Sequence, residues 1–325
     1  MSQQALRSRR LLVGVTAGLL TAALWGSWAV VSRIGLTGAL DHRDITMLRY
    51  VFAGVAMLPL VLRRGVRRHG IAGVPWHHAV IMMLGAGAPY SLLVFAGIER
   101  APANHQAIIG PAGVMLFTVV FSRLLLGERM KVLQYLGVVL IGAGVLGLGS
   151  EALLQGASDI GFAHLLFVLA TVLWSGFTVM SRHVRTDAFT STAIVSTGSL
   201  LVYTPIYFWM TGNRLFSLPV GDLLFQGVFQ GFVIGLIALV LYMHTVNLLG
   251  AGLAAMFAAL VPAMGSVLAY AVLDEPLTRF ATFGLVLVTA GMVMAIVSGA
   301  VGPGRAAASA GQSGGIVPGS KPPGN

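Results

Sequence analysis

The sequence predicts an all-α integral membrane protein with ten transmembrane helices, arranged as two inverted five-helix repeats. Three observations predict this fold class. Of the 325 residues, 57% are hydrophobic and only 9% are charged, ten segments are long and apolar, and short motifs recur at a nearly constant spacing. Soluble domains carry about 25% charged residues, so this chain has too few charges to cover a water-facing surface.

The ten spans follow from length and hydropathy. Crossing the hydrocarbon core takes about 20 mostly apolar residues, and backbone polar groups in lipid must pair within their own segment, which favours helices. The first apolar run is too long for the core of a signal peptide, so we interpret it as a retained helix. The predicted spans are residues 11–33, 45–62, 78–98, 103–126, 132–150, 160–181, 189–211, 223–245, 251–273 and 279–299.

Charge placement predicts the orientation. The net charge of +10 resides mainly in short loops between spans, which is a topology signal and argues against nucleic-acid binding. Arginines precede the first span and follow the second, in the segment 63–68. This bias predicts that residues 1–10 form a cytoplasmic segment and that the C-terminus is also cytoplasmic, in a bacterial inner membrane. Residues 300–325, rich in Gly, Ala, Ser and Pro, are expected to be a disordered cytoplasmic tail.

An internal repeat divides the chain into halves at residues 11–150 and 160–299. Residues 24–33 (LWGSWAVVSR) align with residues 173–182 (LWSGFTVMSR), with five of ten positions identical at an offset of 149. Residues 126–129 (LGER), followed by Gly137 and Gly144, align with residues 273–276 (LDEP), followed by Gly284 and Gly291, at an offset of 147. Five helices per half place the halves in opposite orientations, a recurring transporter architecture with the substrate site near the midplane.

On these motifs, together with Leu48-Arg49-Tyr50 in the second span, the sequence resembles the drug/metabolite transporter superfamily, in particular its EamA-type ten-helix branch. The resemblance covers residues 11 to about 299. It departs from the repeat in the seventh span, which has no arginine matching Arg49. The resemblance implies a cavity lined by helices 1, 3, 4, 6, 8 and 9, with helices 5 and 10 outside. It also implies export or exchange of amino acids, metabolites or drug-like compounds.

Two aromatic faces are candidate walls of a substrate site. Trp25, Trp28 and Ser32 fall at positions i, i+3 and i+7 of the first span, so they share one helical face. The repeat places Trp174, Phe177 and Ser181 on the same face of the sixth span. Such walls can hold a flat or amphipathic molecule or stack on a cation. The alternative is packing against lipid or other helices.

Other polar residues and prolines in the spans are further candidates. Asn104 and His105 open the fourth span, where they could bind substrate or a proton, or cap the helix, whose N-terminus favours a carboxylate. Tyr90 could present its hydroxyl to substrate. His244 could carry a coupling proton or be solvated at a helix end. Pro111 and Pro262 lie inside the fourth and ninth spans and are candidate hinges.

Three charged residues near span ends have competing interpretations. Arg49 lies within the second span, where a charge is by default a functional hypothesis, but its long side chain could also pair with Asp41 or Asp44. Glu128 and Glu275 are related by the repeat. We expect each to cap the following helix, the fifth and the tenth, where negative charge is favourable; a role in gating is the alternative.

These features favour a secondary transporter of small organic molecules, most simply an exporter that uses alternating access, with protons as a candidate coupling ion. The alternatives are a membrane sensor or scaffold and, less favoured, a lipid-modifying enzyme, because no HExxH pattern and no deeply placed acid occurs. The lysines, Lys131 and Lys321, lie outside any phosphate-binding loop pattern. We therefore expect no catalytic residue and no cofactor. The absence of cysteine excludes thiolate metal sites, and a homodimer is left open.

Overall fold

The computed structural model describes residues 3–128, 130–154 and 156–300 of the chain. In this part, ten helical spans are long and apolar enough to cross a membrane, which confirms the predicted all-α membrane fold. Arg129 of the LGER motif and the tail from residue 301 lie outside the described residues. The helices are α1 (Gln3–Leu36), α2 (His42–Arg64), α3 (Trp76–Ala86), α4 (Ala88–Ile98), α5 (Ala103–Leu126), α6 (Val132–Leu154), α7 (Ser158–His183), α8 (Ala188–Thr211), α9 (Val220–Gly227), α10 (Ala238–Leu249), α11 (Ala251–Ala258), α12 (Val261–Leu273) and α13 (Arg279–Ala300), with a 3₁₀ turn η1 (Arg214–Ser217) and a π-helix η2 (Val228–Ile237).

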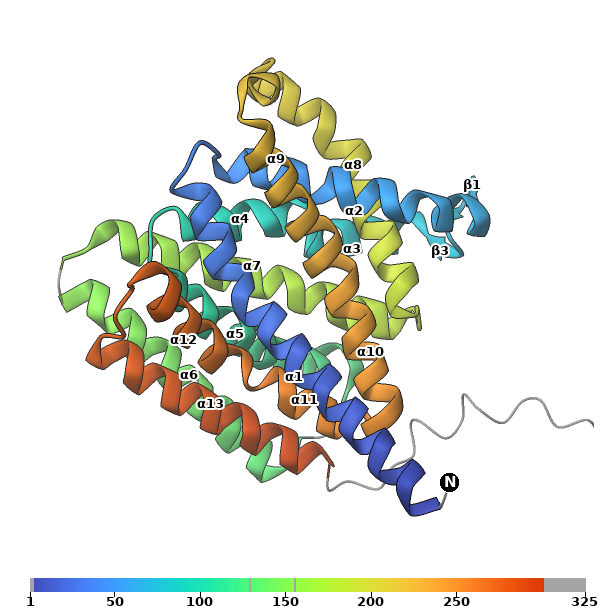
Figure 1. The fold of residues 1–325 in the computed structure, drawn as a ribbon. Helices are drawn as coiled ribbons and strands as arrows, with labels where there is room; N and C mark the ends of the chain where they lie inside the picture. The colour runs from blue at the N-terminus through green and yellow to red at the C-terminus, as the bar shows by residue number, and fades with distance from the viewer. Residues whose placement is uncertain (1–2, 129, 155, 301–325) are drawn as a thin grey trace, which may run out of the picture.

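The spans run back and forth through one bundle (Figure 1). The first helix begins at Gln3, so most of the predicted N-terminal segment extends α1 instead of forming a separate element. Successive spans alternate in direction, which gives the bundle two ends. We call them the Glu275 end, with loops 37–41, 99–102, 212–219 and 274–278, and the Glu128 end, with loop 65–75, residues 127, 128, 130 and 131, and loop 184–187.

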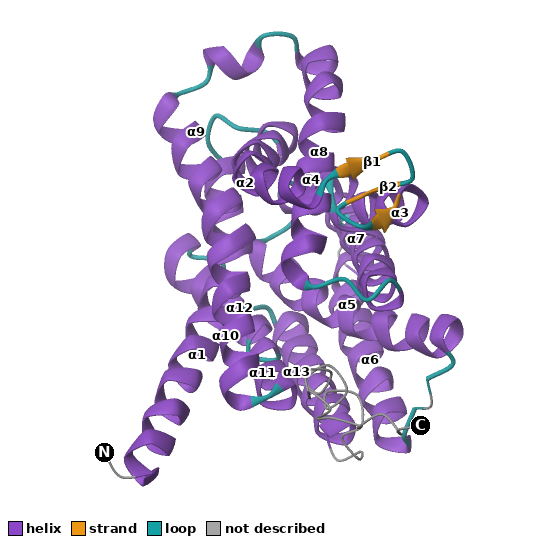
Figure 2. Cartoon of the chain, turned by 90° about the vertical axis from the view of Figure 1, so that its right-hand side faces the viewer, coloured by secondary structure: helices purple, strands orange, loops and turns teal. Residues whose placement is uncertain are grey.

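A small antiparallel sheet fills the loop between α2 and α3. Its strands β1 (Val66–Arg67), β2 (Gly70–Ile71) and β3 (Val74–Pro75) pair in the order β1-β2-β3 and lie beside α3 (Figure 2). Ala72 and Gly73 both have positive φ, which suits the two-residue hairpin turn between β2 and β3. The arginine-rich loop that sequence reasoning treated as a topology signal is therefore an ordered element.

Three of the ten spans are interrupted. The third is divided into α3 and α4 at Gly87, and Pro89 opens α4. The eighth contains the π-helix η2 between α9 and α10. The ninth is divided at Ala259 and Leu260, after which Pro262 lies in the first turn of α12. Pro262 thus begins a helix, whereas Pro111 lies within the continuous helix α5.

Glycines allow the closest helix contacts, as expected where small residues let backbones approach in lipid. In α6 and α13, a Cβ on Gly137 would lie 2.7 Å from the carbonyl oxygen of Gly291, and a Cβ on Gly144 would lie 2.9 Å from that of Gly284. These two helices lie side by side at one edge of the bundle (Figure 1). The four glycines are those of the internal repeat, so the repeat positions are helix-packing positions.

Candidate functional site

A continuous run of aromatic rings crosses the middle of the bundle. Trp28 of α1 stacks on Tyr90 of α4 at 6.3 Å between ring centroids, Tyr90 contacts Trp174 of α7 at 4.7 Å, and Trp174 contacts Phe177 at 5.5 Å. We call these four residues the aromatic run. The two faces expected from the repeat do not meet directly, because Tyr90 lies between them. The structure therefore places four candidate residues, from three different helices, in one array.

Trp25 is not part of the aromatic run. Its ring contacts Tyr242 of α10 at 5.1 Å. Three residues in an α-helix turn about 300°, so Trp25 and Trp28 share a face only approximately. This angular difference directs Trp25 toward α10 and Trp28 toward α4. The shared face predicted from the spacing is thus divided between two neighbours.

A ladder of glutamines holds Trp28 in place. The indole Nε1 of Trp28 donates a hydrogen bond to Gln230 Oε1 at 2.7 Å. Gln230 Nε2 in turn donates to Ser32 Oγ at 3.0 Å and to Gln226 Oε1 at 3.1 Å. Both glutamines are buried. Ser32 therefore helps to orient Trp28, and sequence reasoning missed the glutamines, although two glutamines four residues apart in an apolar span are an unusual pattern.

Arg49 lies over the indole of Trp28, with its guanidinium carbon 5.4 Å from the ring centroid. The expected pairing with Asp41 or Asp44 is wrong, because Asp44 binds Arg214 and Tyr207 and Asp41 binds Arg43. The atom Nη1 of Arg49 is buried and has no hydrogen-bond partner. A cation inside a span is thus left beside an aromatic ring.

The interrupted spans surround this array. Tyr90 lies in the first turn of α4, directly after the break at Gly87, and Gln230 lies in η2. Gly235 of η2 follows Gly87 by 148 residues, which is the spacing of the internal repeat. Interrupted spans at corresponding positions of the two halves are a good indicator of a transporter's binding site. The break and the π-helix both adjoin neighbours of Trp28.

Polar side chains also cluster at the start of α5, apart from the aromatic run. His105 Nδ1 and His164 Nε2 of α7 are 2.9 Å apart, so a single hydrogen bond joins the two buried imidazoles. His164 Nδ1 and the side-chain oxygens of Asn104 and Gln106 are buried without hydrogen-bond partners. Among the described residues no group of His, Cys, Asp and Glu suits a metal ion.

The carboxylate of Glu275 lies at the start of α5. Its Oε2 accepts a hydrogen bond of 2.7 Å from the backbone N–H of Ala103, and its Oε1 lies 3.7 Å from Arg33 Nε. The expectation that Glu275 caps the tenth helix is therefore corrected, because its carboxylate is held at the fourth span, α5. Burial raises the pKa of Glu275, although the N–H of Ala103 and the charge of Arg33 oppose this shift.

A related ion pair lies at the other end of the bundle. Arg182 Nη2 lies 2.5 Å from Glu128 Oε1, and Arg182 Nη1 donates to Ser122 Oγ at 2.9 Å. Both charged side chains are about half exposed, at 48% and 46%, against 23% and 16% for Arg33 and Glu275. Glu128 thus pairs with a residue of α7, the sixth span, instead of with the start of α6.

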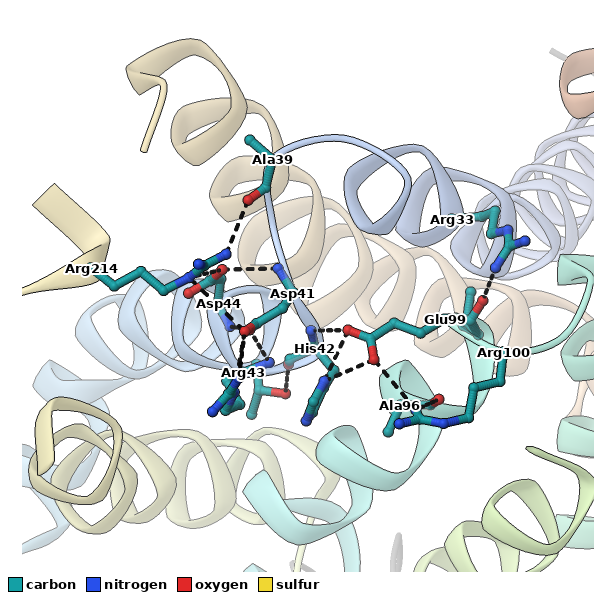
Figure 3. A network of polar contacts seen from close by, with 12 residues as sticks. Arg33, Ala39, Asp41, His42, Arg43, Asp44, Ala96, Glu99, Arg100 and Arg214 are labelled. Carbon is teal, nitrogen blue, oxygen red and sulfur yellow. Dashed lines mark hydrogen bonds and ion pairs between the residues drawn. The ribbon is translucent and has the colours of Figure 1, made fainter. Parts of the chain in front are cut away.

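The Glu275 end also carries a network of polar contacts (Figure 3). The fully buried carboxylate of Asp44 accepts hydrogen bonds from Tyr207 at 2.6 Å and from Arg214 Nε at 3.2 Å. Asp41 caps α2. Burial alone would raise the pKa of Asp41. The pKa is lowered instead, because backbone N–H groups and the charge of Arg43 favour the charged form. This network ties α2 to α8 and to the loop before α9.

A second branch of the network joins α2 to the loop after α4. His42 donates its backbone N–H to Glu99 at 2.7 Å, and its ring Nδ1 lies 2.9 Å from the same carboxylate oxygen. Burial raises the pKa of Glu99, but these contacts and Arg100 outweigh it and leave the pKa lowered. Glu99 is therefore held charged at the Glu275 end.

The remaining candidates lie away from the aromatic run. His244 is exposed and lines a cavity of about 420 Å³ with Arg9, Arg10, Val13 and Leu248 at the Glu128 end. Ser181 Oγ is buried without a hydrogen-bond partner near the end of α7. The ten predicted binding residues thus fall into the aromatic run, the start of α5 and separate positions.

Comparison with known proteins adds an independent line of information. The EamA-like transporter family model matches residues 12–150 and 161–297. The chain is 24% identical over 294 residues to the uncharacterized inner membrane transporter YedA of Escherichia coli (strain K12), covering 88% of this chain and 94% of YedA. It is 23% identical over 252 residues to the uncharacterized transporter YyaM of Bacillus subtilis (strain 168), covering 75% of this chain and 80% of YyaM. A solved crystal structure has the same fold, with a TM-score of 0.56, 24% identity, and coverage of 89% of this chain and 97% of that one.

Proposed function

Because the chain belongs to the EamA-like transporter family, within the drug/metabolite transporter superfamily, we propose that it is a secondary transporter of small organic molecules. The proposed location is the inner membrane of a bacterium, with both termini cytoplasmic. The names of similar proteins, which include an inner membrane transporter, support this location. The proposed direction is export, as the resemblance to the family suggests. No catalytic role is assigned to any residue.

The contacts between the halves support an inverted repeat. Arg33 of the first half pairs with Glu275 of the second, and Arg182 of the second half pairs with Glu128 of the first. Exchanging the halves by the repeat offsets converts one pair into the other, at the opposite end of the bundle. The glycine contacts between α6 and α13 follow the same rule. A pseudo-two-fold axis between inverted halves has this consequence.

The paired ion contacts are the observation that carries the proposed mechanism. Each contact joins one half to the other at one end of the bundle, and the aromatic run lies between the two ends. We propose that the contact at each end is released in turn, so that the substrate is exposed to one side at a time. Pro111 and Pro262 are the proposed hinges, since one lies within α5 and the other at the start of α12.

Coupling and assembly are part of the same proposal. The pair His105 and His164 is the proposed proton carrier, because a hydrogen bond joins its imidazoles within the bundle. Histidine is suited to this role by its titration near neutral pH in water. Membrane lipid is the surrounding partner, and a homodimer is the assembly left open.

The test is transport by the purified protein in proteoliposomes. Counterflow of labelled amino acids, aromatic acids and aromatic amines would detect a carrier without a driving gradient. The cysteine-free sequence permits Arg33→Cys and Glu275→Cys to be joined by a reducible bifunctional thiol reagent. We expect saturable flux that stops on cross-linking and returns on reduction. No flux of any compound by folded protein would favour the sensor or scaffold.

A further inference from the structure

Arg49 is a partly buried cation, and the atom Nη1 of its guanidinium is fully buried. It is the eighth residue of α2, about 10 Å along the axis from the start of the helix. Its Nη1 has no hydrogen-bond partner, and no ion pair joins it to any acid in the described part of the chain. The phenol of the adjacent Tyr50 is engaged with the carbonyl oxygen of Ala86 and with Ser91 Oγ. Burying a charge is costly unless it is paired.

The nearby acids are already engaged. Asp44 accepts hydrogen bonds from Tyr207 and Arg214, and Asp41 from Arg43 and the backbone of α2. The side chain of Arg49 does not extend to the acids of the Glu275 end, because its guanidinium lies over Trp28. The missing negative charge is therefore not available from these side chains.

Packing of the second span does not require a cation at this position. The corresponding spacing of the repeat falls on residues 196–198 of α8, which are Ser, Thr and Gly. These residues are buried and neutral, and α8 packs closely against α2. The second half has small neutral side chains at the position where the first half has Arg49. The arginine is therefore not part of the packing pattern that the two halves have in common.

Beside Arg49 the aromatic run offers an apolar surface. Trp28 contacts both Arg49 and Tyr90, and the run continues to Trp174 and Phe177 on α7. Trp28, Trp174 and Phe177 are only partly buried. Gln230 fixes the orientation of Trp28 through its hydrogen bond to Nε1. A positive charge is thus held at one end of a row of rings.

We propose that Arg49 binds the carboxylate of a small organic monoanion whose aromatic or apolar body packs on the aromatic run. A carboxylate supplies the counter-charge and accepts the hydrogen bond that Nη1 lacks, and charge-assisted bonds of this kind are among the strong ones. None of the contacts described around Arg49 provides an acid for a substrate ammonium, so a monoanion is favoured over a zwitterion. This inference rests on the proposed transport function and names its substrate class.

The test measures binding before transport. The protein in lipid nanodiscs is titrated with phenylacetate, with the uncharged phenylacetamide and with the cation phenethylammonium, and tryptophan fluorescence and thermal stability are recorded. We expect phenylacetate to bind about tenfold or more tightly than phenylacetamide, from the usual strength of a charged hydrogen bond. Arg49→Gln should abolish this preference. Arg100→Gln, an exposed arginine at the Glu275 end, is the matched control and should retain it.

Equal affinity for the acid and the amide, or a preference retained in Arg49→Gln, would overturn the inference. If Arg49→Gln does not fold, Arg49→Lys replaces it. Lysine keeps the charge but not the planar fork, so its preference for the acid should persist with weaker affinity, and a lost preference or an unchanged affinity would contradict the proposal. Counterflow separates this inference from the transport function. Binding of phenylacetate without flux would support the carboxylate site and contradict the transport function. Flux of amines or amides alone would support the transport function and contradict the carboxylate site.

Discussion

Glu275 of the second half accepts a hydrogen bond from the backbone N–H of Ala103 in the first half, at 2.7 Å. The same carboxylate lies 3.7 Å from Arg33. The shorter contact is therefore made to the start of α5, where free N–H groups favour an acceptor. The hydrogen bond to Ala103 and the looser ion pair together hold the Glu275 end closed in the proposed mechanism.

We expect Glu275→Ala to open this end, whereas Glu275→Gln keeps it closed, because the amide oxygen can still accept from Ala103. The measurement is labelling of a single cysteine, Ser32→Cys, by a membrane-impermeant maleimide added on the Glu275 side. Labelling should be faster in Glu275→Ala than in the parent, and unchanged in Glu275→Gln. Equal acceleration in both variants would show that the charge, not the hydrogen bond, holds the end closed.

The raised pKa of Glu275 predicts a pH dependence of the same end. In the closed form burial raises this pKa, while an open form would expose the carboxyl to water and to its ordinary pKa. The form with the higher pKa binds the proton more tightly, so lowering the pH through this range favours the closed form. Labelling of Ser32→Cys should slow on acidification more than in the Glu275→Gln background, which corrects for thiol chemistry. An equal slowing in both backgrounds would contradict this sign.

At the Glu128 end the contact is exposed, so salt should weaken it. An exposed ion pair contributes about 1 kcal/mol or less and is screened by salt. We expect Arg182→Gln, and high salt in the parent, to accelerate labelling of Ser181→Cys from the Glu128 side. Salt should have no further effect in Arg182→Gln. A salt effect that persists in this variant would assign closure to other groups.

The fold was predictable because it depends on composition and on residue spacing. Apolar length located the ten spans, and the repeated glycines marked the close contact between α6 and α13. The partners of Glu128 and Glu275 could not be predicted, since sequence neighbours suggested caps of the following helices. Their actual partners lie in the opposite half of the chain.

The candidate site was predictable only in part, for similar reasons. The repeated spacing selected three of the four rings in the aromatic run, Trp28, Trp174 and Phe177, and Tyr90 was a separate candidate. It could not show that Tyr90 joins them, or that Trp25 turns to Tyr242. Gln230 lies in a π-helix whose geometry is not readable from a period of 3.6 residues. The sequence therefore predicted candidate residues but not the side chains from other helices that contact them.

Asp44 should be the most sensitive acid for stability. Its carboxylate is fully buried and binds Tyr207, Arg214 and the backbone N–H of Asp41. Asp44→Ala removes the acceptor that these three donors have in common, and we expect a loss of about 3 kcal/mol. Asp187→Ala removes the exposed N-cap of α8, with an expected loss of about 1 kcal/mol. Thermal unfolding in one detergent compares the two, and an equal loss would contradict the importance of the buried network.

His105 and His164 should act as one unit in coupling. One hydrogen bond of 2.9 Å joins them between α5 and α7, so replacing either imidazole removes the connection between the two rings. We expect His105→Gln and His164→Gln each to remove the acceleration of transport by a pH gradient while leaving counterflow measurable. The double variant should be no worse than either single variant, because interacting residues are not additive. His244→Gln, at an exposed position, is the control and should keep the acceleration. Gradient-driven transport that survives in both single variants would remove the pair from the proton route and leave it as a contact between helices.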